Sequence, residues 1–151
     1  MIKLYTIGFT EKTAEKFFTL LQKAGVKKIL DIRINNISQL AGFAKGKDLA
    51  YFAKAIIDAD YEHNIDLAPT KALLKDYRDN KISWTHYEKE YIDILNKRNI
   101  LKKLDLNKLN GVCLLCSEHK PDMCHRRLLA EYLHKANQEI EITHLINEHY
   151  A

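Results

Sequence analysis

The sequence predicts one three-layer α/β domain over residues 1–151, built on a doubly wound, mainly parallel sheet of about four strands. Short apolar segments alternate with helical patterns along the chain, which is typical of this class. The first three elements form a strand–helix–strand unit, which predicts parallel pairing through a right-handed crossover. We expect the strand order 2-1-3-4, which makes the first and third strands neighbours.

The first two strands and the helix between them lie near the N-terminus. Residues 3–10, KLYTIGFT, predict a strand that ends at Gly8. Residues 11–25 follow with an apolar helical face and a terminal glycine, which is a typical stop signal. Residues 26–34, VKKILDIRI, are rich in isoleucine and predict the second strand.

A helical insertion is predicted between the second and third strands, at about residues 48–110. Residues 35–48 contain two glycines and several amides, which predict a loop. The insertion shows three helical patterns with a break near residues 58–63, and these patterns cover residues 49–60, 69–80 and 83–99.

The third and fourth strands flank the last predicted helix. Residues 111–118 are almost wholly apolar, so we expect a strand that is buried on both faces. Residues 124–137 carry an apolar helical stripe, and residues 140–147 alternate as a closing strand.

Composition limits the class of protein and its partners. The chain has 46% hydrophobic and 29% charged residues, which is ordinary for a globular protein. A net charge of +4 permits a small anionic or nucleotide-like ligand, and nucleic acid, without requiring either. We see no signal peptide and no membrane-spanning run, and we expect neither a cofactor nor a membrane partner. The odd count of three cysteines favours free thiols in the reducing cytoplasm.

The candidate ligand site lies at the carboxyl ends of the first three strands. In doubly wound sheets, ligands bind outside these ends, at the point where the strand order reverses. The loops that follow these strands contain the candidate groups Thr6, Gly8, Thr10, Asp31, Arg33, Cys116, Glu118, His119, Cys124, His125 and Arg126.

Cys124 and Cys116 are the candidate nucleophiles. Cys124 lies in the first turn of the predicted helix, where unpaired N–H groups favour an anion and can lower a thiol pKa. Cys116 ends the third strand, and either thiol could instead pack or pair with the other. Cys113 points to the opposite face from Cys116, which predicts a core position.

The neighbouring charged groups have two interpretations each. His125 shares a helical face with Leu129 and points inward, as a general acid or base or as a buried structural histidine. Arg33 and Arg126 are the candidate anion-binding cations, with Asp31 to orient them. The alternatives are structural: an ion pair of Arg126 with Asp31 or Glu118, and a structural pair or cap for Asp31 and Arg33.

Aromatic and histidine side chains elsewhere favour structural interpretations. Trp84, Tyr87 and Tyr91 share a helical face and are predicted to be core rather than a base-stacking platform. His63 and His86 are isolated in the sequence, and both are predicted to lie at the surface.

We predict no metal site in the cysteine-rich segment. Paired zinc ligands are usually separated by two residues or a few more, whereas seven residues separate Cys116 from Cys124. Cys124 and His125 are adjacent, which rarely suits one ion.

The sequence resembles the domain of unknown function 488 family, in which C-x-E-x-x-P-x-x-C-H-R-x-x-L-A recurs. LLCSEHKPDMCHRRLLAEYL matches this signature, and YTIGFT, DIRINNIS and LAPTKALLKDYRDNKISWTHYEKEY support it. The resemblance implies roles for Gly8, Asp31, Arg33, Ser38, Cys116, Glu118, Pro121, Cys124, His125 and Arg126.

Three positions depart from the pattern of that family. Phe9 stands where the family commonly has a histidine, Thr10 where serine is usual, and Asn36 where proline is common. If that histidine takes part in chemistry, His119 or His125 must replace it here.

The leading functional hypothesis is a small cytoplasmic enzyme, a cysteine-dependent transferase or hydrolase, acting on an anionic or nucleotide-like substrate. Cys124 or Cys116 is the predicted nucleophile and His125 the acid or base. The predicted substrate-binding groups are Arg33, Arg126, Glu118, Gly8, Thr10, Ser38 and His119. A nucleic-acid-binding module is one alternative, and a redox sensor that uses Cys116 and Cys124 is another.

Overall fold

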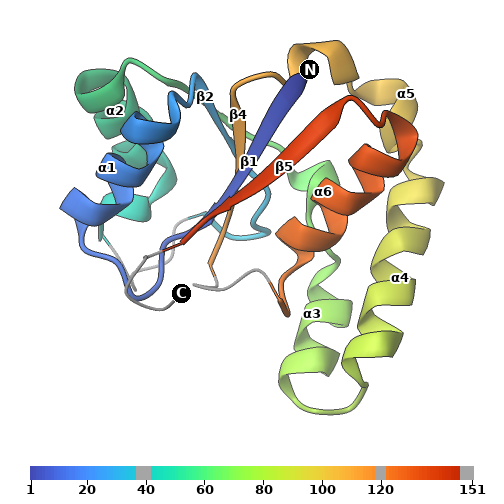
Figure 1. Cartoon of the computed structure of the whole chain (residues 1–151). Coiled ribbons are helices and arrows are strands. Elements are labelled where there is room, and N and C mark those ends of the chain that lie inside the picture. The colour runs from blue at the N-terminus through green and yellow to red at the C-terminus, as the bar shows by residue number, and fades with distance from the viewer. Residues whose placement is uncertain (37–41, 118–121, 147–151) are drawn as a thin grey trace.

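The computed structural model is an α/β protein with one parallel sheet of five strands, and it describes residues 1–36, 42–117 and 122–146. Every strand pair is parallel, and the order across the sheet is β3-β2-β4-β1-β5 (Figure 1). The strands are β1 (Ile2–Gly8), β2 (Lys28–Asp31), β3 (Asp60–His63), β4 (Val112–Cys116) and β5 (Ile140–Leu145).

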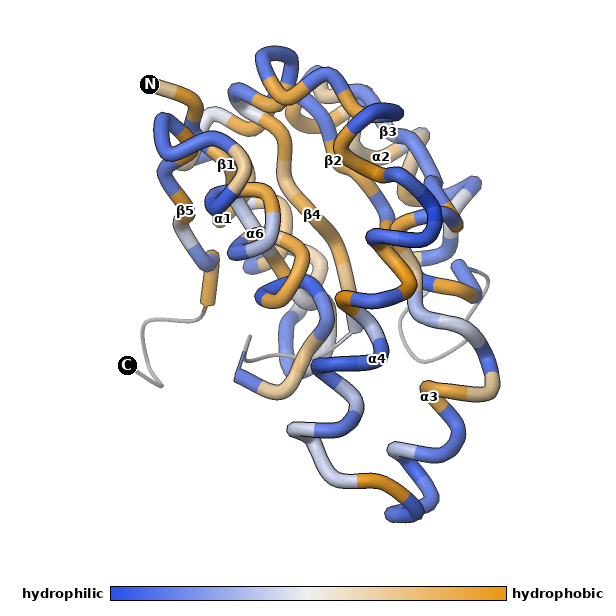
Figure 2. The backbone as a smooth tube through the Cα atoms, turned by 90° about the vertical axis from the view of Figure 1, so that its right-hand side faces the viewer, coloured by the Kyte–Doolittle hydropathy of each residue, from blue (hydrophilic) through white to orange (hydrophobic). Residues whose placement is uncertain are grey.

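The predicted fold class is confirmed, but the predicted strand order is wrong in one respect. The predicted third strand, β4, lies between β2 and β1, so the order of the four predicted strands is 2-3-1-4 rather than 2-1-3-4. Every residue of β4 is buried, as a central strand requires. Figure 2 shows β4 as a largely apolar stretch between β1 and β2.

A fifth strand lies inside the predicted helical insertion. The first predicted helix of that region is α2 (Gly46–Ile57), and the predicted break contains β3, which pairs with β2. β3 is an edge strand of four residues whose side chains alternate between exposed and half-buried. A short edge strand has no apolar run, which explains why periodicity did not reveal it.

Helices cover both faces of the sheet. α1 (Ala14–Ala24) and α2 pack on one face, with β4 residues Cys113 and Leu115 in that core cluster. Leu114, between them in sequence, belongs to the cluster on the opposite face, because successive strand residues alternate. The helices on that face are α3 (Lys71–Arg78), α4 (Trp84–Lys97), α5 (Ile100–Lys103) and α6 (His125–Ala136) (Figure 1).

α3 and α4 form a hairpin that extends beyond the sheet (Figure 1). Thr70 and Ser83 cap the two helices, accepting hydrogen bonds from backbone N–H groups three residues later. Tyr91 anchors the hairpin from α4, because its buried hydroxyl donates to the carbonyl oxygen of Leu67 at 2.6 Å. Arg98 donates to two further carbonyls of the segment that leads into α3.

The carboxyl ends of β1, β4 and β2 lie side by side. Gly8 is in register with Cys116, and Asp31 is in register with Leu115. The chain leaves β1 toward α1 on one face and leaves β4 toward α6 on the other (Figure 1). This is the arrangement at which parallel sheets bind ligands, and it survives the corrected order because β1 and β4 remain neighbours.

No helix within the described ranges has the length and apolar character needed to cross a membrane.

Candidate functional site

A pocket of about 620 Å³ opens at these carboxyl ends. One wall comes from the strand ends and the start of α6, and the other comes from the α3–α4 hairpin. The predicted site residues among its lining are Thr10, Arg33, Cys116, Cys124 and His125. The volume is within the usual range for small-molecule sites.

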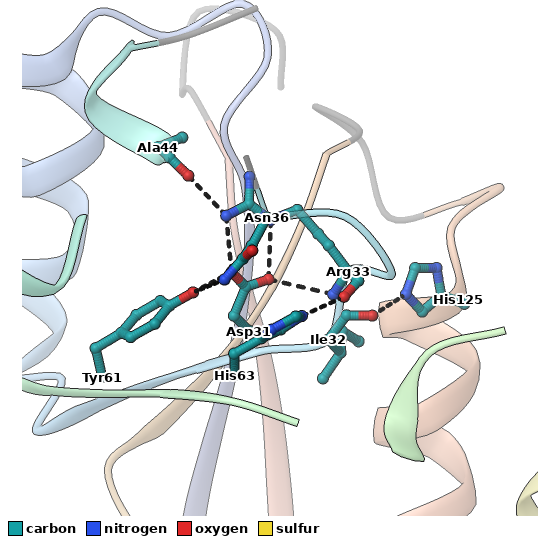
Figure 3. Close-up of polar contacts among 8 residues, drawn as sticks. All are labelled: Asp31, Ile32, Arg33, Asn36, Ala44, Tyr61, His63 and His125. Carbon is teal, nitrogen blue, oxygen red and sulfur yellow. Dashed lines mark hydrogen bonds and ion pairs between the residues drawn. The ribbon is translucent and has the colours of Figure 1, made fainter. Parts of the chain in front are cut away.

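Two thiols and an imidazole meet at the inner wall of the pocket. The Cys124 Sγ lies 2.6 Å from the Cys116 Sγ and is placed as the donor, and the Cys116 Sγ lies 3.6 Å from the Nδ1 of His125. The Nε2 of His125 lies 2.8 Å from the carbonyl oxygen of Ile32 (Figure 3). Because a carbonyl only accepts, Nε2 must carry a proton, which leaves Nδ1 to exchange one with Cys116.

The surroundings of Cys116 favour its thiolate. Burial raises its pKa, but the hydrogen bond from Cys124, the charge of His125 and the charge of Arg126 together hold the pKa well below the ordinary value. Burial lowers the pKa of His125, but the neighbouring Cys116 outweighs this, so its pKa is raised. The pair therefore favours a thiolate beside an imidazolium.

Cys124 behaves in the opposite way to the sequence-based expectation. It immediately precedes α6, which begins at His125. Burial, together with its hydrogen bond to Cys116 and the charge there, raises the pKa of Cys124 well above the ordinary value. These effects on the pKa of Cys124 outweigh any lowering by the start of α6, and Cys124 remains a thiol that donates a hydrogen bond to Cys116.

Asp31 and Arg33 form a buried ion pair at the end of β2. The Nε and Nη2 of Arg33 donate to the two Asp31 carboxylate oxygens at 2.8 and 2.7 Å, and Nη2 also donates to the carbonyl of Ala44 (Figure 3). The Tyr61 hydroxyl from β3 donates to the same carboxylate at 2.5 Å. Asp31 is fully buried and does not line the pocket, so it orients Arg33 from behind.

One nitrogen of Arg33 is not used by this network. Within the described part of the chain, the buried Nη1 has no hydrogen-bond partner. The guanidinium carbon lies 5.2 Å from the centre of the Phe9 ring, so Phe9 supports the cation from one side. Phe9 therefore supplies an aromatic contact to the Arg33 guanidinium.

Arg126 is buried behind the residues that line the pocket. It is fully buried, does not line the pocket, and its Nε donates to the Thr6 hydroxyl at 3.3 Å. That hydroxyl lies 2.6 Å from the Nδ1 of His144. Lys12 is also buried, and burial together with the charge of Arg126 lowers its pKa to about 8. The anion-binding role of Arg126 stays a prediction.

Of the remaining predicted site residues, two lie at the strand ends and the others are outside the described part of the chain. Gly8 pairs beside Cys116, and the backbone N–H of Thr10 donates to the carbonyl of Ser117. Ser38, Glu118 and His119, with Pro121 of the signature, lie outside the described residues.

The burial predicted for the histidines, Cys113 and the aromatic residues can be compared with the structure. The surface prediction for His63 is wrong, because it is half-buried and its Nε2 lies 2.6 Å from the carbonyl oxygen of Arg33. His86 is exposed and Cys113 is in the core, as predicted. Tyr87 and Tyr91 are buried as predicted, whereas Trp84 is half-buried and lines the pocket beside Tyr87.

Sequence reasoning missed Tyr61 and Lys12. Tyr61 alternates with exposed Asp60 and Glu62, which is the one local signal of a strand that turns a tyrosine inward. Lys12 follows the β1 end, but nothing in its local pattern indicates that its side chain is buried.

In the described ranges, one group of at least three metal-ligating side chains is found, and it consists of Cys116, Cys124 and His125. Their donor atoms lie within 4.8 Å of one another. Two thiolates on one tetrahedral zinc ion lie about 3.8 Å apart. The Sγ–Sγ separation of 2.6 Å is shorter than this, so the two sulfur atoms would have to move apart to bind one zinc ion together.

Fold and site together define an α/β protein with a cysteine–histidine pocket at its strand ends. A family model described as "Domain of unknown function DUF488" matches residues 13–133, and the chain belongs to this family. The resemblance expected from the sequence is thereby confirmed, although YTIGFT lies outside the matched range. No curated protein and no solved structure matches the chain.

Proposed function

We propose that the protein is a cysteine-dependent transferase or hydrolase that acts on a small anionic substrate. The observation that supports this most is the Cys116 thiol on the pocket wall, which receives a hydrogen bond from Cys124 and faces His125. A nucleophile, a base and a third group that orients the base are the parts of an activated thiol. Here the carbonyl of Ile32 orients the imidazole.

The proposed chemistry balances without a cofactor. The Cys116 thiolate attacks an electrophilic centre of the substrate, so a bond to sulfur forms while the bond to the leaving group breaks. The imidazolium of His125 gives its Nδ1 proton to the leaving group. Water, or an acceptor hydroxyl, then attacks the sulfur-bound centre, gives its proton back to Nδ1, and releases the Cys116 thiolate.

The test is alkylation with iodoacetamide at pH 7, followed by peptide mass spectrometry. We expect Cys116 to react first, since it alone among the three thiols has a lowered pKa. Cys124→Ala removes the hydrogen-bond donor and should slow alkylation of Cys116, whereas Cys124→Ser keeps an O–H donor and should slow it less. Equal and slow labelling of Cys116 and Cys124 in the wild type contradicts the proposal.

A thiol redox switch is the second candidate, favoured by the Sγ–Sγ contact of Cys116 and Cys124. Hydrogen peroxide would oxidise the two thiols to one disulfide, with loss of two hydrogens and formation of two waters. Mild peroxide should lower the protein mass by about 2 Da in a form that dithiothreitol reverses, as two lost hydrogens require. If sulfinic acid accumulates on Cys116 with no disulfide, the switch is rejected.

We also propose the reducing cytoplasm as the compartment of the protein. The support is the odd number of cysteines, none of which forms a disulfide. A thiolate nucleophile needs such a compartment to stay reduced.

A further inference from the structure

The wall of the pocket formed by the α3–α4 hairpin has a composition that the cysteine chemistry does not explain. Lys71, Lys75 and Arg78 lie four and three residues apart on α3, so they share one helical face, and all three line the pocket. With Arg33, four cationic side chains and one carboxylate, Asp79, line the pocket. A cavity with this lining concentrates positive potential toward an anion.

Part of this positive charge is available to a ligand. Lys75 forms an exposed ion pair with Asp79 at 2.6 Å. No acidic partner is found for Lys71 or Arg78 among the residues that the structure describes. The buried Nη1 of Arg33, on the sheet wall, likewise lacks an acceptor in the described ranges. Hydrogen-bond donors on both walls of the pocket can therefore bind acceptor groups of a ligand.

Aromatic rings lie between these cations on the hairpin wall. Tyr77, Trp84 and Tyr87 line the pocket, with the Trp84 ring stacked on Tyr87 at 5.1 Å and tilted against Tyr77 at 5.4 Å. Tyr87 is almost fully buried, whereas Trp84 and Tyr77 are half-buried. A half-buried aromatic beside cations is the composition that binds a flat base together with its phosphates.

We propose that the hairpin wall is a nucleotide subsite and that the substrate is a nucleoside phosphate. The base stacks on Trp84 and Tyr77, Lys71 and Arg78 bind phosphate oxygens, and the Arg33 Nη1 binds the anionic group next to Cys116. The pocket of about 620 Å³ is large enough for a base, a sugar and phosphates together. This inference rests on the proposed function for its reactive centre, but its binding groups are separate from Cys116.

Trp84 is the single tryptophan of the chain, so its fluorescence reports on this wall alone. We would titrate the full-length protein with adenosine monophosphate, adenosine triphosphate, adenosine and inorganic tripolyphosphate, excited at 295 nm. Both nucleotides should quench Trp84 at lower concentration than adenosine or tripolyphosphate does. Equal affinity for tripolyphosphate and adenosine triphosphate overturns the base-stacking part of the subsite and with it the proposal.

Matched variants locate the binding groups. Lys71→Gln with Arg78→Gln should weaken nucleotide binding and reduce its salt dependence, while Lys89→Gln with Lys97→Gln on the exposed surface of α4 should not. Trp84→Leu, measured by calorimetry, should weaken binding about 10-fold, the size of one lost base–aromatic stack, and Trp84→Phe less. Tighter binding of a single-stranded oligonucleotide than of any mononucleotide overturns the assignment in favour of nucleic acid.

Failure of this inference and failure of the proposed function give different results. If no nucleotide quenches Trp84 at millimolar concentration while Cys116 still alkylates first, the nucleotide subsite is rejected and the nucleophile stands. If nucleotides bind as described while Cys116 labels no faster than Cys124, the subsite stands and the enzyme mechanism is rejected.

Discussion

At the scale of single residues, the site depends on buried charges that satisfy one another. Arg33 and Asp31 are 4% and 0% exposed, so their ion pair is almost fully removed from water. A buried charge is tolerated only with a partner and hydrogen bonds, and Tyr61, the Ala44 carbonyl and the Arg33 backbone N–H supply these. This network fixes the guanidinium at the pocket wall.

The Asp31–Arg33 pair gives a prediction about stability. Asp31→Asn leaves the buried guanidinium without its counter-charge and should lower the free energy of unfolding by about 3–5 kcal/mol. Glu62→Gln breaks the exposed ion pair with Lys28 and should cost about 0–1 kcal/mol. Urea denaturation of both variants checks this, and equal costs would show that Arg33 does not need Asp31.

At the scale of elements, the α3–α4 hairpin depends on a few hydrogen bonds to the segment before it. α4 packs on α6 and on the core, as Figure 1 shows for the two helices. Residues of α3 line the pocket. The bond from the Tyr91 hydroxyl to the Leu67 carbonyl joins α4 to the chain leading into α3. The position of the hairpin wall therefore follows from residues that do not line the pocket.

Removal of that hydroxyl tests this dependence. Tyr91→Phe leaves the buried Leu67 carbonyl without its donor and should cost about 1–3 kcal/mol of unfolding free energy. Tyr132→Phe loses a hydroxyl bonded to Asn96 at the surface and should change stability by less than about 0.5 kcal/mol. Thermal unfolding compares the two, and an unaffected Tyr91→Phe variant would contradict the anchor role.

At the scale of the whole molecule, the Cys116–His125 pair makes stability depend on pH. The lowered pKa of Cys116 contributes stability that is present above the ordinary thiol pKa near 8.5 and is lost as pH falls through the lowered value. The raised pKa of His125 contributes stability present below about 6.5 and lost as pH rises through the raised value. The two slopes have opposite signs and oppose each other between these limits.

The predicted result is a rise of the free energy of unfolding with pH, on the acidic side, that needs Cys116. Below about pH 6.5, and above the lowered pKa of Cys116, stability should rise with pH by up to about 1.4 kcal/mol per unit relative to Cys116→Ser. The serine variant also removes the largest contributions that raise the pKa of His125, which come from Cys116, so it changes the pH dependence of both groups. Parallel pH profiles for wild type and variant, from urea unfolding, would refute this coupling.

Much of the fold could be predicted because its signals are local. The apolar run of β4, the caps of the helices and the apolar face of α1 each follow from neighbouring residues. The order of β1 and β4 could not, since pairing among buried strands depends on contacts far apart in the chain. The prediction that the loops after these strands meet at one edge of the sheet still holds, because the predicted and the observed strand orders both place β1 beside β4.

The candidate site was predictable to the same extent. Local sequence brought Cys116, Cys124 and His125 together, because a short connection joins the end of β4 to the start of α6. The Tyr61 contact with Asp31 spans 30 residues and depends on the pairing of β3 with β2, which the alternation around Tyr61 cannot reveal. Which thiol is activated depends on burial and on proton sharing, which spacing cannot reveal.

The central claim is that Cys116 is held as a thiolate by Cys124 and His125 at the pocket wall. Thiolate absorbance at 240 nm, measured from acid to alkaline pH on wild type and Cys116→Ser, tests it most directly. Wild type should carry one extra thiolate equivalent at neutral pH, which disappears only on acidification and is absent from the variant. If the wild-type thiols instead stay protonated until pH reaches about 8.5 or above, the ordinary value for a free cysteine, the claim is contradicted.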